Sequence, residues 1–109
     1  MTVSQKNIVP GVLLTGALVT LHTAPSGTIE RIINATVTND TAGVIAVTVH
    51  IVSSGGTASA ANKRISARNI AAGETYTCPE LIGRVLQPGD FIQALGNGLS
   101  MDASAFTQV

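Results

Sequence analysis

Alternation of apolar and polar residues with a period of two is the feature that most restricts how this chain can fold. It is clearest from Val44 to Val52, where every second residue is a large aliphatic one: Ile45, Val47, Val49 and Ile51. Successive side chains of a β-strand point to opposite faces. We therefore expect these four residues to face a core and the residues between them, including His50, to face outward. No segment sustains the 3.6-residue period of an amphipathic helix.

Turn signals spaced about 8–12 residues apart divide the rest of the chain into short strands. They are Ala24–Gly27, Asp40–Gly43, Ala72–Glu74, Pro88–Asp90 and Gly96–Gly98. Some seven or eight strands in this arrangement predict an all-β fold, a two-sheet antiparallel β-sandwich of jelly-roll or immunoglobulin-like topology.

Three of these turns carry specific expectations. Asp40–Gly43 lies between two strand patterns, Thr28–Asn39 and Val44–Val52, and we expect it to close a hairpin. Gly96–Gly98 is a hairpin-type turn leading into the last strand. In Pro88–Asp90, the position of Gly89 predicts a positive φ.

A chain of 109 residues has room for one domain. We expect residues 1–10 to be an N-terminal arm and residues 11–109 to form a single β-sandwich domain. The loop Ser53–Asn62 consists mostly of small residues. Because the arm and this loop are weakly patterned for a core, we expect both to become ordered on contact with neighbouring chains and to make most of those contacts.

Charged residues are sparse, at 11% of the chain against about 25% in ordinary soluble domains. The six cations and six anions cancel, and low net charge favours association. Zero net charge argues against a nucleic-acid partner, because binding phosphates requires clustered cations. Lys63, Arg64 and Arg68 form the only cluster, which we interpret as a solvated strand face. The sparse charge therefore predicts that part of the surface is covered by neighbouring molecules. The alternative is a surface that Thr, Ser, Asn and Gln hydrate well enough on their own.

An apolar run from Ile8 to Leu21 resembles a targeting or membrane segment but is interrupted by Pro10, Gly11 and Gly16. It is too short and too broken for a membrane span and lacks a good cleavage pattern, so we expect no membrane partner. Cys78 is the only cysteine, so no disulfide can form within the chain. This cysteine usage suits synthesis in a reducing cytoplasm.

Residues that could carry chemistry are isolated from one another. His22 and His50 show no metal-ligand spacing, and Cys78 has no apparent base to activate it. The Ser53–Thr57 segment lacks the Gly-Lys-Ser/Thr ending of a phosphate-binding loop. Three of the six scattered carboxylates stand at turns, where acidic residues hydrogen-bond the backbone: Asp40, Glu74 and Asp90. We predict no catalytic, cofactor-binding or metal-binding residues, and no enzyme.

The order of the turns resembles that of small virion proteins of tailed bacteriophages. The shared pattern is a TAPSGT-type turn at residues 23–28, a strand ending in a Ser-Gly-Gly loop, and then AAGET, PEL and PGD turns within residues 54–95. The resemblance covers about residues 17–107. It implies a non-enzymatic virion structural protein, a capsid decoration or cement subunit that binds other virion proteins and copies of itself. Such a protein is made in the host bacterial cytoplasm and located in the virion.

The resemblance also fits a second role, as a neck, tail or fibre component that binds a host receptor or glycan. That role requires a concave polar site, usually with aromatic walls. The chain has only three aromatic residues, Tyr76, Phe91 and Phe106.

Overall fold

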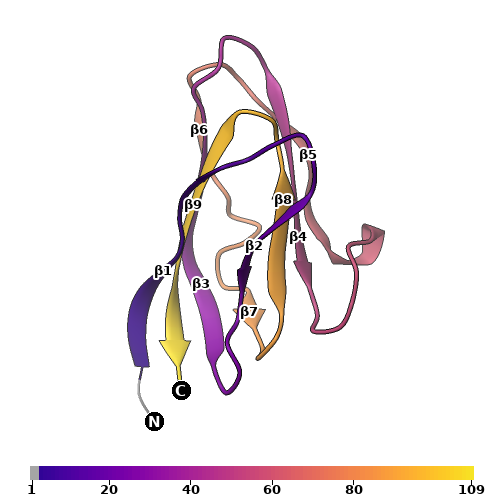
Figure 1. Ribbon diagram of the computed structural model, residues 1–109. Helices are drawn as coiled ribbons and strands as arrows, with labels where there is room; N and C mark the ends of the chain where they lie inside the picture. Colours follow the sequence, from indigo (N-terminus) through magenta and orange to yellow (C-terminus); the bar gives the residue numbers. More distant parts are fainter. Residues whose placement is uncertain (1–2) are drawn as a thin grey trace.

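A computed structural model describes residues 3–109 as nine β-strands and one short 3-10 helix (Figure 1). The elements are β1 (Val3–Leu13), β2 (Val19–Thr23), β3 (Ile29–Asn39), β4 (Ile45–Val52), η1 (Ala60–Asn62), β5 (Lys63–Ile70), β6 (Thr75–Thr77), β7 (Val85–Leu86), β8 (Phe91–Leu95) and β9 (Leu99–Gln108). The molecule is elongated, with principal extents of 46 × 26 × 19 Å. Met1 and Thr2 lie outside the described residues.

The strands form two antiparallel sheets that pack as a sandwich, as predicted. Sheet A has the order β1-β9-β3-β6, with β7 also paired to β3, and sheet B has the order β2-β8-β4-β5. Most consecutive strands lie in different sheets. Such interleaving is the jelly-roll arrangement, and it differs from the immunoglobulin arrangement, in which neighbouring strands more often share a sheet.

The two turns predicted to close hairpins instead connect the two sheets, so those two predictions were wrong. At Asp40–Gly43, the preceding strand β3 pairs with β9, β6 and β7, whereas the following strand β4 pairs with β5 and β8. At Gly96–Gly98, the preceding strand β8 belongs to sheet B and the following strand β9 to sheet A. The physical reason is packing: crossing between sheets sets the apolar faces of the two strands against each other, whereas a hairpin would place them side by side.

The core is aliphatic and confirms the predicted register of β4. Val47 and Val49 are fully buried, while Ile45 and Ile51 are partly buried and pack against the same core cluster. The turn prediction for Gly89 is also confirmed, because its φ is +88°.

The segment predicted as an N-terminal arm joins sheet A wherever it is described. Residues 3–10 belong to β1, which pairs with β9 from Val3↔Gln108 onward. Ile8 and Val9 are buried in the core, whereas side chains from Val3 to Asn7 are exposed. Pairing with β9 satisfies the backbone groups of β1 that face this neighbour, which explains why the segment does not stand apart. The first two residues of the predicted arm lie outside the described residues.

The loop Ser53–Asn62 is ordered by the chain itself, contrary to the expectation that it orders only on contact. The Nδ2 of Asn62 donates to Thr57 O over 2.8 Å, and its Oδ1 accepts from Ser59 N over 2.9 Å. The same Oδ1 lies 2.7 Å from His50 Nδ1. A half-buried polar residue that meets three partners holds the loop in place, because leaving those groups unpaired would be costly.

Candidate functional site

Ionisable side chains do not gather into a metal or catalytic centre in the part of the chain that the structure describes. Residues 3–109 contain no group of three or more His, Cys, Asp or Glu side chains that could hold a metal ion. No helix among these residues is long and apolar enough to span a membrane.

One partly buried pair of ionisable residues links the two sheets, and the sequence analysis did not anticipate it. The Nε2 of His22, on β2, lies 2.5 Å from the Oε1 of Glu30, on β3. The Glu30 side chain is only 1% exposed, and its Oε2 has no hydrogen-bond partner within residues 3–109. The alternation of Thr28, Glu30 and Ile32 along β3 was the signal that could have placed this carboxyl group inside. In the described part of the chain no nucleophile or second carboxylate is hydrogen-bonded to the pair, and its visible contact is one that connects the two sheets.

The other two residues considered as candidates for chemistry, His50 and Cys78, are buried within the fold. His50 is buried and hydrogen-bonded to Asn62. Cys78 is also fully buried, and burial, followed by the nearby Glu80 carboxylate, raises the pKa of its thiol to about 12. A thiol in this state is not a nucleophile at neutral pH, because the thiolate is the reactive form.

The acidic residues predicted to hydrogen-bond turn backbones do so at two of three positions. Glu74 accepts from Ala71 N over 2.8 Å. Asp90 accepts from Ser54 N over 3.0 Å and from Gln87 N over 2.9 Å. Asp40 is exposed and makes no hydrogen bond with its side chain among the described residues. Its carboxylate is therefore left available to a partner.

The three residues of the predicted cationic cluster differ in their exposure and contacts. Lys63 is exposed, Arg64 is half-buried, and the guanidinium of Arg68 lies 4.1 Å from the centre of the Tyr76 ring. The Tyr76 hydroxyl in turn donates to the Glu80 carboxylate over 2.8 Å. Stacking on an aromatic ring gives Arg68 a structural role.

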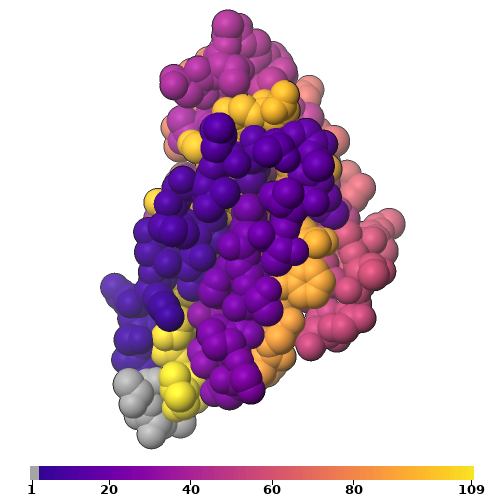
Figure 2. All heavy atoms as spheres, viewed as in Figure 1, coloured from indigo at the N-terminus to yellow at the C-terminus, as the bar shows by residue number. Residues whose placement is uncertain are grey.

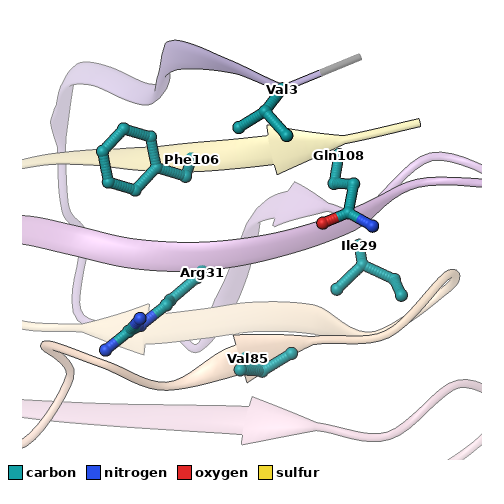
Figure 3. A pocket seen from close by; sticks show the side chains of 6 residues that line it. All are labelled: Val3, Ile29, Arg31, Val85, Phe106 and Gln108. Atoms are coloured by element: carbon teal, nitrogen blue, oxygen red, sulfur yellow. The ribbon is translucent and has the colours of Figure 1, made fainter. Parts of the chain in front are cut away.

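The outer face of sheet A carries a hollow of about 350 Å³ (Figure 3). It is lined from four neighbouring strands by Val3, Ile29, Arg31, Val85, Phe106 and Gln108, which we call the sheet A hollow. The pairing register explains the grouping: Phe106, Arg31 and Val85 are cross-strand partners in one row, and Val3, Gln108 and Ile29 form the next. Partners in register point to the same face of a sheet.

The hollow is apolar except for one cation and one amide. Its four apolar side chains are between 40% and 57% exposed, a large fraction for residues of this kind: Val3, Ile29, Val85 and Phe106. Arg31 is its only charged residue, and the guanidinium forms no salt bridge within residues 3–109. An apolar patch with a few polar groups on a sparsely charged surface is typical of a protein-binding site. Sequence reasoning did not find it, because its residues come from both ends and the middle of the chain.

Solved structures share this fold at low sequence identity. A chain from the structure described as "Bacillus endospore appendages form a novel family of disulfide-linked pili" is 13% identical, with a TM-score of 0.60 over 99% of this chain and 88% of that chain. A chain of the infectious bursal disease virus Gx strain is 14% identical, with a TM-score of 0.56 over 97% of this chain and 32% of that chain.

A chain of the T13 infectious bursal disease virus particle is 10% identical, with a TM-score of 0.56 over 97% of this chain and 30% of that chain. This protein thus spans about a third of the two viral chains. At such identities the likeness shows the fold. No protein-family model and no curated protein matches the sequence.

Proposed function

We propose that this chain is a non-enzymatic structural subunit of an assembly built from many protein copies. The more specific form of the proposal is a capsid decoration or cement subunit in the virion of a tailed bacteriophage, made in the host cytoplasm. The observation that carries it is the sheet A hollow, an exposed and mostly apolar site on the outer face of that sheet.

The chemistry of the surface supports a protein partner. Apolar side chains that remain open to water are stabilised when a neighbour covers them, by about 25 cal/mol for each Å² buried. Sparse charge and zero net charge also favour association. The partners are copies of the same chain or other virion proteins.

The architecture supports an assembly role by analogy. Jelly rolls form the subunits of many viral capsids, and the similar solved chains come from pili and from a viral particle. A fold is compatible with many functions, so this support adds to the argument from the hollow and does not replace it.

Assembly of this chain would be non-covalent. The similar pili are described as disulfide-linked, but the single cysteine here is fully buried. Its raised pKa further disfavours thiol–disulfide exchange, because the thiolate is the attacking species. We therefore expect assembly to be insensitive to reducing agents.

Two measurements test the proposal. Sedimentation velocity of the purified chain from micromolar to millimolar concentration should show species larger than the monomer. Electron microscopy of phage particles that carry this protein should reveal a jelly-roll density on the capsid surface. Density in the neck, tail or fibre would replace the decoration role with the alternative one. A strictly monomeric chain that is absent from particles would contradict a structural role altogether.

Matched variants connect the first measurement to the hollow. Phe106→Ser removes the largest apolar side chain of the hollow, and we expect it to weaken association. Leu13→Ser removes an even more exposed apolar side chain, 67% exposed, that does not line the hollow. This control should associate like the unaltered chain.

A further inference from the structure

The two ends of strand β3 carry opposite charges. Arg31 is the third residue of β3, and Asp40 directly follows its last residue, Asn39. At about 3.3 Å per residue, roughly 30 Å separates the two side chains along the strand. Figure 1 shows the turn after β3 at one end of the molecule and the start of β3, beside the C-terminus, at the other. One long molecule thus presents a cation at one end and an anion at the other.

The acidic end is a projecting turn, which we call the β3–β4 turn, residues Asp40–Val44 (Figure 2). Val44 is 62% exposed. At the start of the same turn, Asp40 is exposed and has no side-chain hydrogen-bond partner among residues 3–109. The turn therefore displays one carboxylate and one large aliphatic side chain to solvent.

The β3–β4 turn is held rigid from within. The Oδ1 of Asn39 accepts from Thr41 N over 2.9 Å and from Thr41 Oγ1 over 2.6 Å. The Nδ2 of Asn39 donates to Gly43 O and to Ile70 O, each over 2.8 Å. Asn39 is itself fully buried. A surface element that is already ordered loses little conformational entropy on binding, which favours its use in an interface.

The sheet A hollow offers what this turn requires. Arg31 provides the unpaired cation for the carboxylate, and Ile29, Val85 and Phe106 provide apolar surface for an aliphatic side chain. A volume of about 350 Å³ is at the low end of the range found for binding sites and suits a few side chains.

We propose that copies of this chain join head to tail, with the β3–β4 turn of one copy seated in the sheet A hollow of the next, Asp40 paired with Arg31 and Val44 covered by the apolar lining. This inference rests on the proposed function, because it specifies how an assembly subunit binds its own copies. Such a contact joins two different surfaces and therefore continues into a filament or closes into a ring.

Packing one hollow against another is a less favourable use of the same surface. A two-fold contact of that kind would bring two Arg31 side chains together in an apolar site that contains no anion. Like charges brought together in an interface repel each other and disfavour the contact. Charge complementarity therefore favours the acidic turn as the occupant.

Charge reversal tests the contact. Arg31→Glu and Asp40→Arg should each weaken self-association by about tenfold or more, as expected when a partly buried ion pair is replaced by like charges. The combination of both substitutions should restore association, because the pair is rebuilt with reversed polarity. Lys63→Glu is the control: it reverses an exposed charge outside the hollow and should leave association unchanged.

Sedimentation equilibrium measures association, and circular dichroism confirms that each variant is folded. Arg31→Gln, which only removes the charge, should weaken association less than Arg31→Glu but in the same direction. Single reversals that associate like the unaltered chain, or a double variant that fails to recover, would overturn the head-to-tail contact while leaving the assembly role intact. A chain that stays monomeric yet occurs in particles would also overturn only this contact. A monomeric chain absent from particles would overturn both.

Discussion

The outer faces of the two sheets differ in how far their apolar side chains are exposed to solvent. On sheet B, Val52 follows the outward-facing His50 by two residues, yet both are buried, because the loop Ser53–Asn62 is fastened to His50 through Asn62. On sheet A, Phe106 and Val85 also face outward but remain more than 40% exposed. The chain covers the part of the sheet B outer face around His50 and Val52 with its own loop, and it leaves the apolar residues of the sheet A hollow open. This difference is why we propose sheet A as the face that binds a second molecule.

The largest expected effect tests which residues of β4 face the core and which face outward on sheet B. Val49→Asp should abolish folding, since it places an unpaired charge in the core at a cost above about 4 kcal/mol. Thr48→Asp, one residue away, should fold, because Thr48 is only half-buried and its Oγ1 already accepts from Ala67 N over 3.1 Å. Urea unfolding of both variants checks this. Equal stability would contradict the assigned register of β4.

Next in size is a substitution where the covering loop meets the turn Pro88–Asp90. Gly89 has a φ of +88°, and a Cβ built there would lie 2.5 Å from Ser54 Oγ, within the loop. Gly89→Val should therefore lower the free energy of unfolding by about 2–3 kcal/mol through backbone strain and displacement of the loop. Thermal unfolding is the measurement, and an unchanged melting temperature would show that neither constraint matters.

These three substitutions also separate what the sequence revealed from what it did not. Alternation located the core face of β4, and the Pro-Gly-Asp pattern located the positive φ of Gly89, because both are local properties of a few residues. The assignment of each strand to one of the two sheets is not a local property of a few residues. Asp40–Gly43 resembles a hairpin turn whether the chain then pairs with the preceding strand or crosses to the other sheet. Only the packing of whole strands decides between the two.

The sheet A hollow could not be predicted from the sequence for the same reason. Val3, Ile29, Val85 and Phe106 come from four strands, and only the pairing register brings them into two adjacent rows. The sparse charge predicted that some surface is covered by neighbours, but it could not locate that surface.

A matched pair of truncations compares the two outer faces directly. Val52→Ala should lower the free energy of unfolding by about 2 kcal/mol, because the side chain is fully buried under the loop. Phe106→Ala should lower it by about 1 kcal/mol or less, because much of that ring is already in water. Guanidinium unfolding of dilute, monomeric protein provides both values. A larger loss at Phe106 than at Val52 would reverse the comparison.

The smallest expected effect concerns the residue that fastens the loop. Asn62→Ala removes the partner of His50 and two bonds within the loop, so it should cost about 1.5 kcal/mol. Hydrogen exchange should also become faster across residues 53–62. Unaltered exchange there would mean that other contacts hold the loop and that Asn62 is dispensable.

The central claim is that the open face of sheet A becomes covered by a neighbouring molecule, and oxidative footprinting of the assembled protein tests it most directly. Hydroxyl radicals modify exposed side chains, so modification is measured by mass spectrometry in the monomer and in the assembly. Phe106 should lose most of its reactivity on assembly, while Leu13, which is exposed outside the hollow, should keep its own. If Phe106 remains as reactive in the assembly as in the monomer, sheet A is not the binding face.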